Sequence, residues 1–569
     1  MAKCADKNPM PDAAAYRRPP EVVMRLARMG SFHQTRLSFM RTLLRRLQRE
    51  KWTFKRNLWA IDAQGFGRAV YTVYGPQRAY SLVAFSHDLP DHMRSDRVIA
   101  TAWDATFALY DGVPDEADLD RLEQNVPKQE AGRISDSELS LSRANRSVRL
   151  WQHVVDRLAI GQQPEREQLE AVGYLVRTTA VYGSGKFGAA DRLTIAGRPE
   201  VSGPFQAEML SVWLTRAFSI DLVEHVAAAR GGDQAVVIDP DLRRRIGVGN
   251  STGLGMAPFL INHPALLNNW MMAREEALAR VRSLPRAEAK AIDEFRDHFE
   301  RACFNVAQWH SEHPVQIAKL QDLNADLERM RDYIARESLA DDHPWDRFYR
   351  WAEKHLSLEG QEQLVSLLLE PYGELVDDLT QCMDADEHLS FFIDGAMPLA
   401  GLRDIIERQC QWALAVDYDQ PENRARFWYT SAEKLEPRVG ERFEEPGAEY
   451  ELPLAVGLDI KRLYTALTQF EPGASTAEFL LAHPEHRHSV RRVQNLAARP
   501  YAEIQDNLVA ADMLPIDILR CKLSFFGATR FDPRSDRWVR ICMFQDAPFP
   551  QELLAPATVL AGAKAGSSA

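Results

Sequence analysis

The sequence predicts an α+β protein that is predominantly α-helical, with a large helical body, a small antiparallel β-meander near the N-terminus and a β-hairpin near the C-terminus. Apolar residues recur at helical spacing along most of the chain. Two runs rich in β-branched and aromatic residues, "RAVYTVY" and "AYSLVAF", flank a Gly-Pro turn, and "ILRCKLSFF" and "RWVRICMF" flank a second polar loop. Strands do not alternate with helices in this pattern, so we expect no βαβ array.

The chain begins with a basic segment, residues 1–56, which we expect to form an arm and a helix. It carries 14 Lys and Arg against 4 Asp and Glu, whereas the remainder carries 55 basic and 77 acidic residues. An acidic body disfavours nonspecific binding to nucleic acid, because that binding depends on basic surface. Arginines such as Arg36 and Arg46 could contact nucleic acid or an acidic partner. We expect them instead to dock on the chain's own acidic body or across a homo-oligomer interface.

The rest of the chain divides into four regions. Residues 57–112 carry the meander, and residues 113–415 form a helical body that contains two Gly-rich loops. Residues 416–555 are a mixed region that contains the hairpin. Residues 556–569 form a disordered tail, because "ATVLAGAKAGSSA" is small and polar. A chain of 569 residues is long enough for two to four domains.

Residues typical of helix starts and ends predict the main helices of the helical body. Ser135 is a favourable cap for a helix that ends near Gly161, and a further helix is expected over residues 204–230, where Gly231 and Gly232 end it. Two amphipathic helices joined by a short connection follow, and they predict an antiparallel helical hairpin.

Six cysteines are scattered along the chain without a C-x-x-C pair. This pattern favours free thiols in a reducing compartment over secreted disulfides or a zinc site. The N-terminal residues lack the apolar core of a secretory signal. No run approaches the roughly 18 apolar residues that span a bilayer. We therefore expect a soluble cytoplasmic protein without a membrane partner.

The stretch "VYGSGKFGAADR", residues 181–192, satisfies the pattern G-x-G-x-x-G. A dinucleotide fingerprint needs a strand before this pattern and a full helix after it, but "AADRLTIAGRPEVSG" leaves no room for a crossover helix. The stretch also lacks two required residues of a Walker loop, and no V-A-I-K, H-R-D or D-F-G element follows in order. We therefore expect no nucleotide motif in this loop.

The same loop gathers polar side chains that could meet a ligand. Its glycines permit positive φ and close approach of another group. A helix end with solvated charges would explain the same residues. The ligand hypothesis assigns this wall of a pocket to Arg177, Tyr182, Gly183, Ser184, Gly185, Lys186 and Arg192.

A second Gly-rich loop lies in "RRRIGVGNSTGLGMAPFLINHPALLNNW", residues 243–270. A glycine loop that leads into a helix N-terminus exposes backbone N–H groups beside the positive end of the helix dipole, which suits phosphate or carboxylate. A tight structural connection is the competing interpretation. The ligand hypothesis assigns the opposite wall of the pocket to Asn250, Ser251, Thr252, Gly253 and Asn268.

Three residues are candidates for proton transfer: Tyr182, Lys186 and His263. His263 titrates near neutrality, although as the residue before Pro264 it could equally cap a helix. Over these few residues the second loop resembles glycine loops of small-molecule kinases and of pyridoxal-phosphate enzymes. That resemblance implies Lys186 as a Schiff-base lysine, but the sequence identifies no cofactor.

Other titratable residues support weaker hypotheses. A buried Glu208 or Glu224 on the helix over residues 204–230 would be a base with a raised pKa, whereas a solvated face would leave it ordinary. The histidines at 310, 313, 483, 486 and 488 lack a recognisable set of metal-ligand partners. We therefore expect no metal site.

Two functions compete. The first is a soluble metabolic enzyme that binds a small anionic substrate or cofactor, bearing carboxylate or phosphate, between the loops 183–188 and 247–255, with acid–base chemistry. The second is a noncatalytic interaction protein whose basic N-terminal helix binds an acidic partner or nucleic acid. The first requires the two loops to approach within the length of a ligand.

Overall fold

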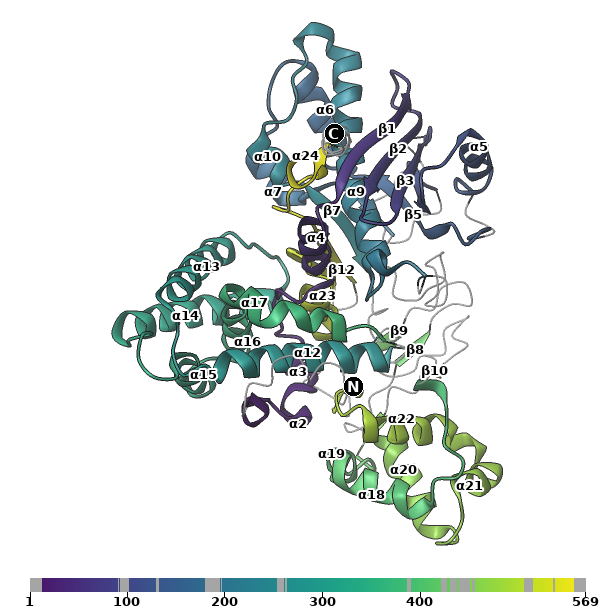
Figure 1. The fold of residues 1–569 in the computed structure, drawn as a ribbon, viewed down its shortest axis with the longest axis vertical. Coiled ribbons are helices and arrows are strands. Elements are labelled where there is room, and N and C mark those ends of the chain that lie inside the picture. Colours follow the sequence, from purple (N-terminus) through teal and green to yellow (C-terminus); the bar gives the residue numbers. More distant parts are fainter. Residues whose placement is uncertain are drawn as a thin grey trace, which may run out of the picture. The chain divides into compact units, whose positions relative to one another are not determined.

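The computed structural model divides the chain into two compact units (Figure 1). Unit 1 comprises Met1–Leu37, Gly253–Phe525 and Pro533–Val539, and unit 2 comprises Ser38–Thr252, Phe526–Asp532 and Arg540–Ala569. Neither unit is one continuous stretch of sequence. The structure describes residues 13–90, 92, 102–128, 132–179, 195, 197–252, 260, 263–385, 390–420, 427–429, 437–439, 451–452, 456–505, 515–535 and 538–556.

A large mixed sheet dominates unit 2. Among the described residues it has ten strands in the order β11-β12-β7-β6-β5-β4-β3-β2-β1-β13. The mostly helical α+β class is confirmed, but the expectation of a small meander and a separate hairpin is wrong, because both belong to this one sheet. The strands are β1 (Thr53–Ile61), β2 (Gly67–Tyr74), β3 (Ala79–Ser86), β4 (Ala105–Asp111), β5 (Glu138–Arg146), β6 (Tyr174–Thr178), β7 (Gly247–Thr252), β11 (Arg530–Ser535), β12 (Trp538–Met543) and β13 (Ala555–Pro556).

Strand β5 replaces the helix expected from Ser135 to Gly161. Its sequence, "ELSLSRANR", buries Leu139 and Leu141 at a spacing of two, which is the period of a strand. A helix, α6 (Trp151–Ala159), follows only after the strand has ended.

Helices cover both faces of this sheet. On one face, α5 (Glu116–Asn125) places Leu119 and Leu122 in a core cluster with Leu141 of β5. On the other face, Phe218 of α9 (Gln206–Gly231) meets Phe107 edge-on at a centroid distance of 5.6 Å. The bounds of α9 confirm the helix expected over residues 204–230. The remaining helices of unit 2 are α4 (Phe39–Arg49), α7 (Arg166–Val172), α10 (Pro240–Arg244) and α24 (Pro550–Leu553).

Strands β6 and β7 are parallel neighbours, and α9 lies between them in the sequence. This arrangement is a βαβ unit, in which the helix runs back along the sheet between two parallel strands. A single βαβ unit is not the array that the sequence pattern excludes. The signal is weak in the sequence because β6 has only five residues and directly follows the helix α7.

Unit 1 is helical. Its long helices α13 and α14 occupy the positions of the two expected amphipathic helices. The helices are α2 (Pro20–Val23), α3 (Leu26–Met29), α12 (Pro264–Arg282), α13 (Ala289–Ala307), α14 (Pro314–Arg336), α15 (Pro344–His355), α16 (Leu358–Leu368), α17 (Gly373–Val376), α18 (Leu399–Gln409), α19 (Gln411–Leu414), α20 (Val456–Gln469), α21 (Thr476–Ala482), α22 (Arg487–Ala498) and α23 (Pro515–Phe525). None of the described helices is long and apolar enough to cross a membrane.

Two C-terminal assignments need correction. "ILRCKLSFF", expected to be a strand, lies within the helix α23, and part of the loop expected after it is the strand β11. A short apolar run has the same composition in a buried helix and in a buried strand, so periodicity does not separate them. The region between α19 and α20 contains a small sheet in the order β10-β8-β9, formed by β8 (Phe427–Tyr429), β9 (Pro437–Val439) and β10 (Glu451–Leu452).

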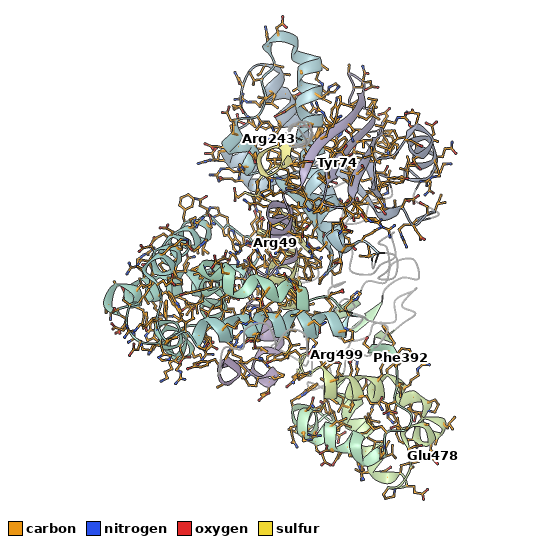
Figure 2. All side chains as sticks on the ribbon, viewed as in Figure 1. Arg49, Tyr74, Arg243, Phe392, Glu478 and Arg499 are labelled. Atoms are coloured by element: carbon orange, nitrogen blue, oxygen red, sulfur yellow. The ribbon has the colours of Figure 1, made fainter. Side chains whose placement is uncertain are left out.

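A separate helical core within unit 1 is built from α18 to α22, with Leu402, Ile460 and Val493 fully buried in it. Helix α21, on which Glu478 is labelled in Figure 2, begins with a capping box. In it Ser475 and Glu478 each accept a hydrogen bond from the other's backbone N–H. The sequence favours buried thiols, and Cys410, Cys521 and Cys542 are buried and free; Cys303 is free but only half-buried, and Cys382 is disulfide-bonded.

Of the basic N-terminal segment, described residues 13–37 are part of unit 1 and residues 38–56 are part of unit 2. Arg18 is 3% exposed and forms ion pairs with Glu275 (2.7 Å) and Glu362 (2.6 Å), both fully buried. Arg36 binds Asp377 through two nitrogens, at 2.7 and 2.8 Å. The expected docking of basic residues on the chain's own acidic groups is confirmed for Arg36.

Candidate functional site

Two of the predicted site residues, Arg177 and Asn250, lie on adjacent strands of unit 2. The register pairs Arg177 with Gly249 and Thr178 with Asn250. The Asn250 side-chain nitrogen donates to the carbonyl oxygen of Thr178 (2.9 Å). The first Gly-rich segment therefore follows β6, and the second begins within β7 and continues past its end. Seven predicted residues lie outside the described part of the chain: Tyr182, Gly183, Ser184, Gly185, Lys186, Arg192 and Gly253. The side chains of Ser251 and Thr252 also lie outside the description.

Only one end of the Asn250 side-chain amide has a hydrogen-bond partner among the described residues. Its nitrogen is committed to Thr178, while its oxygen has no hydrogen-bond partner among the described residues, although the residue is only 1% exposed. The bond to Thr178 fixes which end of the amide is the oxygen. A buried polar atom without a partner costs about 1–3 kcal/mol, so such atoms are rare in folded proteins.

The face of α9 that lies against the sheet carries two further buried polar groups, both hydroxyls, that have no hydrogen-bond partner among the described residues. Ser211, Thr215 and Phe218 follow one another at helical spacing, and Phe218 contacts Phe107 of the sheet. Ser211 and Thr215 are fully buried, and neither hydroxyl has a partner among the described residues. By contrast, the Ser219 hydroxyl one turn later donates to the Arg216 carbonyl oxygen (2.8 Å).

The face of the sheet that lies against α9 also carries polar side chains. Ser142 is paired with Phe107, so Ser142 and, two residues earlier, Ser140 face α9. Ser140 is 2% exposed, and its hydroxyl has no partner among the described residues. The pairing of β5 with β6 and of β6 with β7 places Thr178 and Asn250 on this same face of the sheet.

The first half of α9 carries two ionisable side chains, Glu208 and Arg216. Arg216 of α9 donates to the carbonyl oxygen of Ile246, just before β7 (2.6 Å). Glu208 is half-buried, and burial raises its pKa to about 7. The raised pKa expected of a buried carboxyl on this helix is therefore found at Glu208, and its role as a base stays a prediction.

A second acidic residue lies close to the N-terminus of α9. Glu200 is 5% exposed, and one of its carboxylate oxygens accepts a hydrogen bond from the Tyr80 hydroxyl (3.1 Å). The other oxygen has no partner among the described residues. Burial, followed by the charge of Glu200, raises the pKa of Tyr80 well above its usual range, so this hydroxyl keeps its proton.

Two other predicted residues belong to unit 1. His263 is the N-cap residue of α12 and makes no side-chain capping bond. Asn268 is fully buried; its oxygen accepts from the Tyr501 N–H (3.1 Å), and its nitrogen donates to Asn269 (3.2 Å). The Asn268 oxygen therefore connects α12 to the segment that contains Tyr501.

The other carboxyl candidate on α9, Glu224, has a hydrogen-bond partner nearby. One oxygen of Glu224 accepts from the Ile238 N–H (3.0 Å), and burial raises the pKa of this half-buried carboxyl. Within the described residues no group of three or more His, Cys, Asp or Glu side chains has a geometry that could hold a metal ion.

No protein-family model, curated protein or solved structure matches this chain.

Proposed function

We propose that unit 2 binds a small anionic ligand, bearing a carboxylate or a phosphate, at the carboxyl ends of β6 and β7, as the substrate or cofactor of a metabolic enzyme. The observation that carries this proposal is the βαβ unit, since both of its parallel strands lead into Gly-rich segments. In sheets with parallel strands, ligands bind outside the carboxyl ends of the strands, beside the helix N-terminus.

Two further features favour an anion at this place. The N-terminal turn of α9 receives no hydrogen bond from a capping side chain, and its 26 aligned peptide units place positive charge there. Arg177, the penultimate residue of β6, lies just before the first Gly-rich segment and is only 9% exposed; one residue before Thr178, its side chain leaves the sheet on the face opposite α9. A guanidinium group in low-polarity surroundings attracts carboxylate or phosphate more strongly than it does in water.

Acid–base chemistry at this end of the sheet would use Glu208. Its pKa of about 7 allows the carboxyl to take up and release a proton near neutral pH. Tyr182 and Lys186 stay predictions on the Gly-rich segment. The second function, recruitment of a partner by the basic N-terminal helix, gains no support at Arg36 or Arg46, because Arg46 donates to the carbonyl oxygens of Glu200 and Ser202.

Thermal unfolding of the full chain with inorganic phosphate, at constant ionic strength, tests the proposal. A ligand at a hundred times its Kd stabilises by about 2.7 kcal/mol, so we expect the unfolding temperature of unit 2 to rise by roughly 5–10 °C. Lys186→Ala and Arg177→Gln should abolish that rise. Arg230→Gln, at the exposed far end of α9, is the matched control and should retain it.

The proposal would be contradicted if neither phosphate nor citrate raised the unfolding temperature of the native chain. So would a rise that survives in Lys186→Ala and Arg177→Gln but is lost in Arg230→Gln, because the anion would then bind at the other end of α9.

A further inference from the structure

We propose that unit 1 binds single-stranded nucleic acid on the solvent-facing side of α22, where arginines contact phosphates and an exposed phenylalanine ring stacks on a base. The residues of this site, which we call the α22 surface, are Arg487, Arg491, Arg499, Phe391 and Phe392. The inference goes beyond the proposed function, because it concerns the other unit and a ligand of another class.

The solvent-facing side of α22 is basic. The opposite side of this helix is buried in the helical core of unit 1, through Val490, Val493 and Leu496. The helix contains no Asp or Glu, and of its arginines Arg492 is covered and pairs with Glu503 (3.5 Å). Burial, followed by the charges of Arg487 and two other arginines, lowers the pKa of His488, which agrees with positive charge gathered on this side.

Three arginines form a stripe along this side of the helix. Arg487, Arg491 and Asn495 follow one another at intervals of four residues, over about 12 Å of the helix axis. The Arg499 guanidinium continues the stripe, because it donates to the side-chain oxygen of Asn495. Cations spaced along a line match an extended phosphate backbone better than they match one small anion.

The segment before α18 lies beside this stripe. The Asp394 backbone N–H donates to the Gln494 side-chain oxygen (2.8 Å), and the Gln494 nitrogen donates to the Asp394 carbonyl oxygen (2.8 Å). One turn earlier on α22, the guanidinium of Arg491 lies over the Phe391 ring, 4.7 Å from its centroid. This contact restricts Arg491 before a ligand arrives, which lowers the entropy that binding costs.

Phe392, labelled in Figure 2, supplies an exposed aromatic ring next to these cations. It is 73% exposed, and Phe391 is 49% exposed. A base can stack on such a ring whatever its sequence, and one ring is enough for one base. A lipid surface matches less well, because affinity for a bilayer grows with the apolar area inserted and the outward side of α22 is polar.

The rest of the chain is acidic and limits the attraction of phosphates to this stripe. We therefore expect few phosphate contacts and a large share of the affinity from stacking. A duplex, whose bases already stack on each other, should bind more weakly than a single strand of the same length.

Fluorescence anisotropy of the full chain with a short labelled oligouridine, and with a duplex of the same length, tests the proposal. Arg487→Gln and Arg499→Gln should each weaken binding of oligouridine and reduce the slope of log affinity against log salt by about 0.7. Phe392→Ser should weaken binding about fivefold or more and leave that slope unchanged.

Two variants elsewhere in unit 1 are matched controls. Arg408 is 65% exposed on α18, where it pairs with Asp404, and Phe304 is 59% exposed on α13. Arg408→Gln and Phe304→Ser should bind oligouridine as the native chain does. Their unfolding temperatures and that of Phe392→Ser should match the native value, because exposed side chains contribute little to stability.

Failure of oligouridine to bind at low ionic strength would overturn the inference. Vesicles of phosphatidylserine and phosphatidylcholine test the alternative in the same series. Binding to vesicles that Phe392→Ser removes, without binding to oligouridine, would make the α22 surface a lipid contact. Binding to oligouridine that persists in Arg487→Gln, Arg499→Gln and Phe392→Ser, or that Arg408→Gln weakens equally, would place the nucleic acid elsewhere on the chain.

Discussion

At the scale of single residues, unit 2 concentrates unsatisfied polar chemistry at one end of α9. The Asn250 side-chain oxygen and the Ser211 and Thr215 hydroxyls are buried and have no hydrogen-bond partner among the described residues, and Glu208 on the same helix as Ser211 and Thr215 has a raised pKa. Folding stability alone would favour apolar side chains at such positions. Residues that cost stability in the free protein are expected at functional sites, where a ligand compensates for them.

Glu208→Gln should stabilise the protein, and more so at higher pH. The pKa of Glu208 is about 7 in the folded state, above its ordinary value near 4.5, so the folded protein holds the proton more tightly than the unfolded chain. Stability from this group is therefore present at acid pH and falls as pH rises toward and through 7. Each unit of pKa difference corresponds to about 1.4 kcal/mol.

Urea unfolding of both proteins at several pH values between about 5 and 8 checks this prediction. Glu208→Gln should match the native chain at the acid end and exceed it at the basic end. A stability difference that stays constant across this window would mean that Glu208 ionises at its ordinary pKa.

At the scale of elements, the sequence predicts those whose boundaries carry strong chemical signals. Helix α9 lies where the Ser-Gly-Pro start and the Gly231-Gly232 end place it. Strand β5 was assigned to a helix because Ser135 resembles a cap, although Leu139 and Leu141 carry the strand period. Strand β6 is too short for its period to be distinguished from a helix end.

The candidate site was accessible to sequence reasoning only in part. Asn250 and Arg177 were identified from glycine patterns, and Glu208 from its apolar neighbours on α9. Their proximity depends on the pairing of β6 with β7 across an intervening 26-residue helix, which no local pattern reveals. The hydroxyls of Ser211 and Thr215 recur at helical spacing on an otherwise apolar face of α9, and that signal could have been used.

The junction of α9 with α6 yields a prediction for Gly231. A Cβ atom at this position would lie 2.0 Å from the carbonyl oxygen of Ala159, at the end of α6, and backbone cannot move aside cheaply. We expect Gly231→Ala to destabilise unit 2 by about 1–3 kcal/mol, as overpacking does. Gly197→Ala, whose added methyl would meet nothing within 4 Å, is the control. Equal unfolding temperatures for the two variants in calorimetry would disprove the close approach of the two helices.

At the scale of the whole molecule, each unit is assembled from segments distant in the sequence. Residues 1–37 complete unit 1, where Val23 and Met24 are fully buried and Gln505 donates its backbone N–H to the Met24 carbonyl oxygen. Burial alone would raise the pKa of Glu362, but Arg18, Arg274 and Arg28 outweigh it and hold that pKa well below its usual range. Described residues 13–37 of the basic N-terminal segment are thus an integral part of unit 1.

Arg18→Gln and Arg17→Gln, adjacent in sequence, test that conclusion. Arg18 is buried against Glu275 and Glu362, so its loss leaves two buried carboxylates short of a partner and should cost about 3–5 kcal/mol. Arg17 is 31% exposed and pairs with Glu276, so its loss should cost at most about 1 kcal/mol. Because the folded-state pKa of Glu362 is lowered, its contribution to stability is present above about pH 4.3 and is lost as pH falls further, so the penalty of Arg18→Gln should shrink in acid. Urea titrations followed by circular dichroism measure both variants, and equal small losses would mean that the segment is free to bind a partner.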